Sequence, residues 1–335
     1  MTSHIDFEKT AQLLKGILKR DTRSISKALT LIESALPKDK KQSEILLEQL
    51  LLQKHKSLRI AISGIPGVGK SSFIDEFGRI LLEENLSIAV LAVDPSSPIS
   101  GGSILGDRTR MQYLSSNDKV FIRPSPGGTN QGGVARRTRE SLLLLEGAGF
   151  DIVLVETIGV GQSEYKVSDM VDIFLLLAMP ATGDDLQAMK RGINEVADII
   201  AITKSDGLLL PAAKLTQAEL ESSFKLNSKA LETQKSVVLT SALEKTGFKQ
   251  IWQSIRALQD YREKNGEASN KRKQQYGKWL DAELEEQTLD IIKKFVLQNP
   301  EYAEVKKQVE LKKTLPRIAA EHCIKNLLKS PSKID

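Results

Sequence analysis

The sequence has one cysteine, few aromatic residues and no long apolar run. Because Cys323 is the single cysteine in 335 residues, no disulfide can form within the chain, and this usage is typical of a reducing compartment. Aromatic residues make up 5% of the chain, too few for a succession of base-stacking rings. The longest apolar run, Ile173 to Met179, is far shorter than the roughly 20 residues that cross a bilayer. We expect no membrane contact.

Histidine is scarce too. His4, His55 and His322 lie far apart, so no group of Cys and His has the spacing of a metal site. The N-terminus carries Asp6 and Glu8 before any apolar segment, which argues against a secretory signal or an Arg-rich transit peptide. We therefore expect a cytoplasmic protein.

The chain is mildly basic, with a formal net charge of +5. Its basic residues are scattered, and Lys271, Arg272 and Lys273 form the densest group. A solvated helix face is the favoured interpretation of that group, because such runs usually face water. We expect no nucleic-acid partner.

Apolar periodicity changes twice along the chain. Residues 7–54 show helical spacing, and from Gly247 onward helices are predicted at 248–264, 273–298 and 301–329, with breaks near 265–269, at Pro300 and at Pro316. Between them, continuous apolar runs alternate with helical stretches, which predicts a mostly parallel sheet flanked by helices. The seven runs are Arg59–Ser63, Ile88–Val93, Val120–Ile122, Ile152–Val155, Ile173–Met179, Ile199–Thr203 and Val237–Thr240. We divide the chain into a helical N-terminal segment (1–56), a central domain (57–262) and a helical C-terminal arm (263–335).

Residues 64–71 match G-x-x-x-x-G-K-[ST], a phosphate-binding loop that follows a predicted strand and precedes a helix. Its backbone N–H groups and the helix N-terminus attract phosphate. Lys70 would add a positive charge and Ser71 a hydroxyl ligand for Mg²⁺, and we expect Lys70 to face solvent when no nucleotide is bound. The sequence thus predicts a P-loop NTPase fold. The expected contacts are Gly64, Ile65, Pro66, Gly67, Val68, Gly69, Lys70, Ser71 and Ser72.

Besides the hydroxyl of Ser71, a P-loop needs a carboxylate nearby to hold Mg²⁺. Glu156 ends a buried strand, where a Mg²⁺ ligand, direct or through water, would lie. Gly159 would give its backbone N–H to the terminal phosphate. Most GTPases have Asp at the position of Glu156, so this residue is a departure.

Thr203-Lys204-Ser205-Asp206 matches the guanine-recognition pattern [NT]-K-x-D after a strand. The carboxylate of Asp206 would accept two hydrogen bonds from guanine, and the stem of Lys204 would lie along the ring. Thr203 replaces the commoner Asn. After the last strand, Ser241, Ala242 and Leu243 are expected in a loop whose backbone meets the guanine carbonyl. These motifs predict a GTPase.

Longer stretches between the motifs resemble the methylmalonyl-CoA mutase-associated GTPases, once described as lysine/arginine/ornithine transport ATPases. The resemblance covers about residues 20–260. It is carried by residues 92–111, 121–126, 132–140, 156–164 and 183–192. Thr203 and the spacer 127–131 depart from the family pattern.

The resemblance implies a homodimeric GTPase that acts as a chaperone for an adenosylcobalamin-dependent acyl-CoA mutase, gating the loading and protection of its cofactor. Asp94, Asp107 and Glu156 would serve Mg²⁺ and the switch segments. Gln187 and Lys190 would couple the nucleotide state to the partner, and the C-terminal helices would form the dimer arm.

The same residues have plainer interpretations. Asp94 precedes a proline and is typical of a turn, and Asp107 would also suit a helix N-cap. Gln162 would orient water for hydrolysis or be a polar loop residue. Lys190 would also suit a solvated helix face. The expected catalytic residues are Lys70, Asp107 and Gln162.

Four other functions remain open. A nickel-delivering, metallochaperone-type GTPase would need a Cys/His site that the sequence lacks. A transport-associated ATPase would bind ATP in competition with GTP, which Asp206 argues against. An RNA-binding GTPase would show a salt-dependent RNA shift, and a purely structural protein would not hydrolyse GTP.

Overall fold

The computed structural model describes residues 7–34, 36–53, 55–93, 111–123, 131–157, 163–180, 196–227 and 236–328. The chain divides into two compact units, Met1–Lys273 and Gln274–Asp335. The first holds the sheet, and the described part of the second, up to residue 328, is helical with short connections. The three-part division at residues 56 and 262 stays a prediction.

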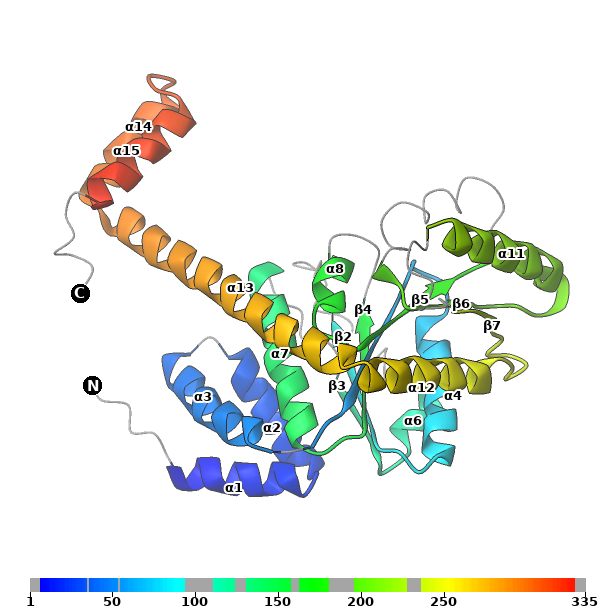
Figure 1. Ribbon diagram of the computed structural model, residues 1–335. Helices are drawn as coiled ribbons and strands as arrows, with labels where there is room; N and C mark the ends of the chain where they lie inside the picture. The colour runs from blue at the N-terminus through cyan, green and yellow to red at the C-terminus, as the bar shows by residue number, and fades with distance from the viewer. Residues whose placement is uncertain are drawn as a thin grey trace. The chain divides into compact units, whose positions relative to one another are not determined.

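The first unit is built on a seven-stranded sheet in the order β3-β2-β4-β1-β5-β6-β7 (Figure 1). Every neighbouring pair is parallel, and each of the seven predicted runs forms one strand. The predicted fold class is therefore confirmed. The strands are β1 (Leu58–Gly64), β2 (Ile88–Val93), β3 (Val120–Arg123), β4 (Ile152–Thr157), β5 (Ile173–Ala178), β6 (Ile199–Ile202) and β7 (Ser236–Leu239).

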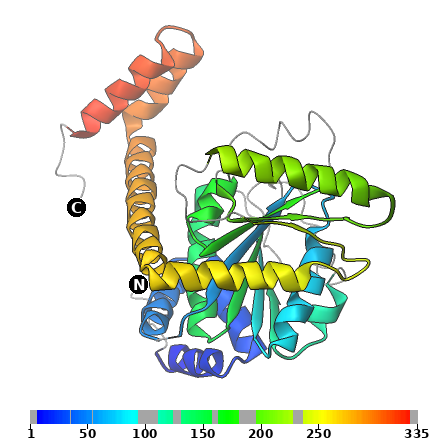
Figure 2. The same cartoon turned by 45° about the vertical axis from the view of Figure 1, so that its right-hand side comes forward.

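Helices cover both faces of the sheet, so alternate residues of each strand enter different cores (Figures 1 and 2). Ile60 and Ile62 of β1 pack toward α4 (Lys70–Glu83), α6 (Gln112–Ser115) and α12 (Phe248–Lys264). Ala61 packs toward the opposite layer, which holds α7 (Gln131–Gly147), α8 (Ser163–Ser168) and α11 (Leu210–Asn227). A strand buried on both faces has to be apolar throughout, which explains the continuous runs.

Aromatic rings join the helix that follows the phosphate loop to α12. Phe73 of α4 lies 5.1 Å from Phe248, and Phe77 lies 6.4 Å from Trp252, measured between ring centroids. All four side chains are buried, with Trp252 the most exposed at 8%. The start of α4 is thus held against α12 by a compact aromatic contact.

The N-terminal helices form an outer layer beside α7. They are α1 (Phe7–Leu18), α2 (Thr22–Glu33) and α3 (Pro37–Leu51). Their buried residues, among them Ile17, Leu29 and Leu46, share the core with α7 and the sheet. Two leucines within the region of predicted helical spacing, Leu18 and Leu36, are about half exposed instead, at 45% and 53%.

The prediction of a solvated face at Lys271–Lys273 is wrong for two of its three residues. Only Lys273 is exposed. Arg272 donates to Asp172 Oδ1 and Oδ2 at 2.6 Å each and to Glu146 Oε1 at 2.8 Å. The Lys271 ammonium donates to the carbonyl of Asp172 at 2.7 Å. Both side chains therefore face the sheet, where acidic groups precede its strands.

We call this group the basal ion cluster: Arg59, Glu146, Asp172, Asp198, Arg262, Lys271 and Arg272. Arg59 pairs with Glu146, and Arg262 pairs with Asp198. Asp172 and Asp198 directly precede β5 and β6, so the cluster lies at the amino ends of the strands. Burial lowers the pKa of Lys271. Burial would also lower the pKa of Arg272, but hydrogen bonds and charge from Asp172 and Glu146 outweigh this effect and raise that pKa.

In the described part of the chain, three helices follow α12. They are α13 (Glu267–Gln298), α14 (Pro300–Glu310) and α15 (Pro316–Leu328). The breaks predicted at Pro300 and Pro316 are present, with Asn299 capping α14 through its side-chain oxygen, 3.0 Å from the N–H of Glu301. The break near 265–269 is shorter than predicted, because α13 already begins at Glu267. Among the residues that the structure describes, no helix has the length and apolarity needed to span a membrane.

Candidate functional site

The described candidate residues gather at the carboxyl ends of four strands. Parallel strands present these ends at one edge of a sheet, where α/β proteins bind their ligands. The residues follow or end β1, β4, β6 and β7. Six further candidates lie outside the described residues, so their predicted roles stay predictions: Asp94, Asp107, Gly159, Gln162, Gln187 and Lys190.

The phosphate loop runs from the end of β1 into the first turn of α4. Gly69 has φ +97°, a left-handed conformation that glycine adopts without strain. At Gly64 a Cβ atom would lie 2.7 Å from the carbonyl oxygen of Leu177 on β5, so only glycine fits this close approach. The loop therefore lies against the end of the neighbouring strand, with Pro66 and Gly67 exposed and Val68 fully buried.

Lys70 does not face solvent as predicted. Its Nζ donates to the carbonyl oxygens of Gly64 at 2.7 Å and Ile65 at 3.3 Å, and the side chain is half-buried. A carbonyl-rich loop offers the ammonium group the acceptors it would otherwise find in water. The positive charge is thus already at the loop that the sequence assigns to phosphate.

Ser71 and Glu156 are the described candidates for a metal site. Ser71 is half-buried in the first turn of α4. Glu156, 6% exposed, is paired in register with Ile62 of β1, two residues before the P-loop. Hydroxyl and carboxylate oxygens suit Mg²⁺, which usually takes only one or two protein ligands. No group of three or more His, Cys, Asp or Glu suited to a metal occurs in the described parts of the chain.

Residues 203–206 contact the phosphate loop directly. Lys204 has a left-handed φ of +53°, and its Nζ donates to the carbonyl of Gly67 at 2.9 Å. The hydroxyl of Thr203 lies 2.7 Å from the carbonyl oxygen of Val68. The predicted base-reading and phosphate-binding segments are therefore neighbours in space, although about 135 residues separate them in sequence.

Ser241 has a contact that the sequence did not predict. Its hydroxyl donates to the carboxylate of Asp206 and accepts the N–H of Glu244 at 3.0 Å. Ser241 is fully buried, whereas Leu243 is 83% exposed. This contact fixes the orientation of the Asp206 carboxylate. A hydroxyl residue directly after the last strand was the signal in the sequence, but the predicted role was given to its backbone.

Asp75 is a further polar residue that sequence reasoning missed. From α4 it accepts the backbone N–H of Leu114 at 3.0 Å and of Tyr113 at 3.4 Å. These N–H groups belong to the first turn of α6, so the carboxylate joins α6 to the helix that follows the P-loop. An Asp in the middle of a helix carries no sign of such a distant partner in its sequence context.

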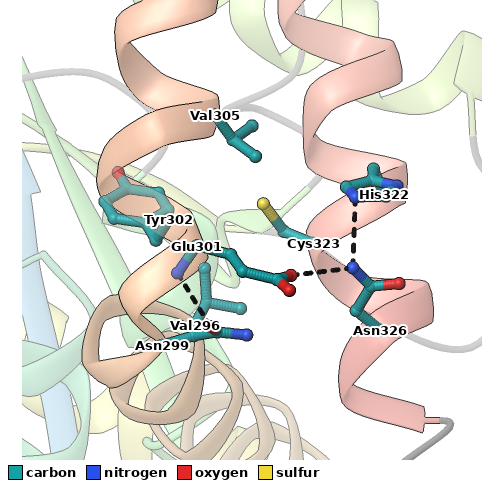
Figure 3. Close-up of a pocket in the computed structure, with 8 residues that line it drawn as sticks. All are labelled: Val296, Asn299, Glu301, Tyr302, Val305, His322, Cys323 and Asn326. Carbon is teal, nitrogen blue, oxygen red and sulfur yellow. Dashed lines mark hydrogen bonds between the residues drawn. The ribbon is translucent and has the colours of Figure 1, made fainter.

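The second unit has a small hollow between α14 and α15 (Figure 3). The residues that line it come after every candidate site residue in the sequence. Asn326 donates to Glu301 at 3.1 Å and lies 3.1 Å from the Nε2 of His322. Cys323 and the apolar Val296 and Val305 also line it. These contacts join two antiparallel helices, and we interpret the hollow as part of their packing.

The fold and the motifs at its carboxyl edge define a P-loop NTPase whose base-recognition segment is of the guanine type. The comparison with known families gives the particular group. The family model described as "Methylmalonyl Co-A mutase-associated GTPase MeaB" matches residues 25–296. The chain belongs to this family, as the resemblance of its motifs predicted. It is therefore a GTPase and binds guanine nucleotide.

Individual relatives agree with this assignment. The chain is 43% identical over 293 residues to "Methylmalonic aciduria type A homolog, mitochondrial" of Mus musculus, covering 84% of this chain and 71% of that protein. It is 42% identical over 281 residues to "GTPase ArgK" of Escherichia coli K12, covering 84% and 85%. A solved structure described as "Crystal structure of LAO/AO transport system kinase" aligns with TM-score 0.73 and 30% identity, over 97% of this chain and all of that one.

Proposed function

We propose that this GTPase is a chaperone that gates the loading and protection of adenosylcobalamin in an acyl-CoA mutase of the methylmalonyl-CoA type. The observation that carries this proposal is the family match over residues 25–296, whose description names association with that mutase. The relative from mouse, named for methylmalonic aciduria, supports it.

The geometry supports distinct roles in GTP binding for the described residues. The backbone of residues 64–69 and the N-terminus of α4 would hold the phosphates. Lys70 would leave the carbonyls of Gly64 and Ile65 for the terminal phosphates, a short move because its Nζ already lies at the loop. Charge developing on these phosphates during hydrolysis would be stabilised by that ammonium group.

The other end of the nucleotide would lie at residues 203–206 and 241–243. Asp206 would accept hydrogen bonds from guanine, with Ser241 keeping its carboxylate in place. Lys204 would cover the ring while its Nζ stays on the carbonyl of Gly67.

Mg²⁺ would be held through Ser71 and Glu156, joined in our proposal by Asp94 and Asp107. When bound, the ion would neutralise charge on the phosphates. Buried oxygen ligands at the end of β4 fit this hard cation. Gln162 is proposed to orient the attacking water.

The coupling to the mutase is assigned to Gln187 and Lys190, in the stretch that follows β5. We expect Gln187→Ala with Lys190→Ala to keep GTP affinity within a few-fold and to lose the stimulation of hydrolysis by the mutase. Coupling free energies are typically about 1–3 kcal/mol, so a roughly 5- to 150-fold stimulation is at stake.

The experiment measures GTP turnover with and without a purified adenosylcobalamin-dependent mutase. If the double variant is stimulated as strongly as the wild type, this stretch is not the relay. If the wild type responds to no such mutase, the chaperone function fails and the GTPase assignment remains.

Two further features complete the proposal. A homodimer formed through the C-terminal helices is proposed from the family resemblance, and sedimentation of the full chain tests it. A cytoplasmic location remains a prediction. The transport-associated function for which the solved relative is named is the second candidate, and competition of ATP against GTP distinguishes it from ours.

A further inference from the structure

The short helix α6 receives its N-terminal cap from another helix. Its own N-cap residue is Met111, whose side chain makes no capping hydrogen bond. A capping side chain normally accepts the N–H of the second or third helical residue, and in α6 these are Tyr113 and Leu114. The carboxylate of Asp75 on α4 accepts both N–H groups, at 3.4 Å and 3.0 Å respectively. Asp75 therefore takes the place of a local cap, although it lies 38 residues before Tyr113.

Close packing holds α6 on the same helix. Three residues after Asp75, a Cβ atom added to Gly78 would lie 2.5 Å from Cδ2 of Leu114, so the glycine gives room for the side chain of α6. Leu114 is fully buried and Met111 is 1% exposed. Asp75 is half-buried, so water competes only in part for its hydrogen bonds. The cap and the packing together fix α6 against one face of α4.

The face of α4 that holds α6 also carries a proposed ligand of Mg²⁺. Ser71 lies four residues before Asp75, and residues four apart are neighbours on the surface of a helix. Asp107, another proposed ligand, precedes Met111 by four residues. Four residues of chain span at most about 14 Å. The place where α6 is anchored therefore limits where Asp107 can reach.

We infer that Asp75 is a positioning residue for Mg²⁺: by capping α6 from α4, it fixes the point at which the chain that carries Asp107 returns to the helix of the phosphate loop. The inference rests on the proposed function, in which Ser71 and Asp107 serve the same ion. Mg²⁺ demands near-ideal octahedral geometry, so a ligand whose anchor shifts holds the ion less tightly. Asp75 acts without touching the ion, because both of its oxygens accept hydrogen bonds from α6.

Binding of a fluorescent, non-hydrolysable GTP analogue to the full-length chain, titrated with Mg²⁺, tests the inference. Asp75→Ala removes both acceptors. We expect the Mg²⁺ concentration for half-maximal effect to rise about 5- to 30-fold, the factor that corresponds to the loss of a helix cap. The affinity for the analogue in EDTA should stay within about twofold of wild type, since the phosphate loop and the base-reading segment are unchanged.

Two further variants separate the hydrogen bonds of Asp75 from its charge. Asp75→Asn removes the charge but keeps an oxygen that can accept the N–H of Leu114, and should raise the Mg²⁺ requirement by no more than about threefold. Glu76→Ala is the matched control, because it removes a carboxylate from the adjacent position of α4. Glu76 pairs with Arg79 and Lys245, and its loss should leave the Mg²⁺ requirement close to that of the wild type.

Amide hydrogen exchange of the nucleotide-free chain examines the cap without metal or ligand. In Asp75→Ala the N–H groups of Tyr113 and Leu114 should exchange about 5- to 30-fold faster than in the wild type, because the start of α6 opens more often. In Glu76→Ala their exchange should be unchanged. Exchange at the wild-type rate in Asp75→Ala would show that the carboxylate does not hold α6, and would overturn the inference.

The Mg²⁺ titration has other outcomes that would overturn the inference. These are a wild-type Mg²⁺ requirement in Asp75→Ala, an equal rise in Glu76→Ala or Asp75→Asn, and a loss of affinity in EDTA as large as that in Mg²⁺. If the wild type itself binds the analogue equally well in Mg²⁺ and in EDTA, the proposed Mg²⁺ site fails and the inference falls with it. A wild type that responds to Mg²⁺ beside an Asp75→Ala variant that responds equally overturns the inference alone.

Discussion

Lys70 is the side chain whose charge the proposed site uses most directly. We expect Lys70→Ala to weaken GTP binding by about 100-fold or more, since it removes a charge-assisted contact to the phosphates. Its bonds to Gly64 and Ile65 are half-buried, so the free energy of unfolding should fall by no more than about 1.5 kcal/mol.

Calorimetry with GTP and thermal unfolding without nucleotide measure the two effects of Lys70→Ala. Lys245→Ala removes an exposed ammonium group from the loop after β7 and serves as the matched control, with affinity close to wild type. GTP binding by Lys70→Ala at wild-type affinity would show that the Lys70 ammonium group does not contact the phosphates.

Asp206 is expected to read the base. Asp206→Asn should lose about 30- to 1000-fold in GTP affinity, the equivalent of about 2–4 kcal/mol, and should gain affinity for xanthosine triphosphate. Xanthine has a carbonyl where guanine has an amino group, and an amide can donate to it. Competition binding with both nucleotides is the measurement, and Asp260→Asn, on the exposed side of α12, should leave both affinities unchanged.

Sequence reasoning reached the motifs but not the contacts between them. Gly64–Ser71 and Thr203–Asp206 are local patterns, so their strand-end positions could be predicted. The bonds from Thr203 to Val68 and from Ser241 to Asp206 join residues 135 and 35 positions apart. Such contacts depend on strand order, which apolar periodicity does not specify.

The same limit explains the error at the start of α13. Lys271 and Arg272 look like any basic run on a helix, because their partners are remote: Glu146 is 126 residues from Arg272. The strands, in contrast, were predicted well, because a strand buried on both faces has a continuous apolar run regardless of its neighbours. The acidic partners, Asp172 and Asp198, gave no signal either, since an Asp before a strand is also typical of a turn.

Within α13, two adjacent cations should differ in their contribution to stability. Arg272→Met should destabilise the protein by about 3–5 kcal/mol, because it leaves buried carboxylates without their partner. Lys271→Met should change the free energy of unfolding by less than about 1 kcal/mol, since burial already disfavours its charge. Denaturant unfolding of both variants measures the difference, and equal losses would contradict the prediction.

The lowered pKa of Lys271 also predicts a pH dependence. In the unfolded chain this lysine binds its proton up to its ordinary pKa near 10.4, and in the folded chain it loses the proton at lower pH. Between the two values the unfolded state binds more protons, so the contribution of Lys271 to stability rises with pH. The free energy of unfolding of the wild type, relative to that of Lys271→Met, should therefore increase as pH rises from neutral toward about 10. The difference between the wild type and Arg272→Met should show no such trend.

The division of the chain into two units predicts where it can be shortened. A chain that ends at Lys273 keeps the whole first unit and should keep its melting temperature and its affinity for GTP. A chain that ends at Gly266 lacks Lys271 and Arg272, and should melt roughly 5–15 °C lower. Calorimetry of the two truncated chains is the test, and equal melting temperatures would show that the basal ion cluster adds little.

The aromatic contact behind the phosphate loop makes the molecule its own spectroscopic reporter. The chain has two tryptophans, and they fall in different units, Trp252 in the first and Trp279 in the second. Trp252 is 8% exposed and lies against Phe77 of α4. Its emission should be blue-shifted in the native state and should respond when nucleotide shifts that helix. Trp279→Phe leaves this single probe, and Trp252→Phe leaves one that follows the second unit alone. The intrinsic fluorescence of these two variants, with no attached dye, therefore separates events in the first unit from events in the second.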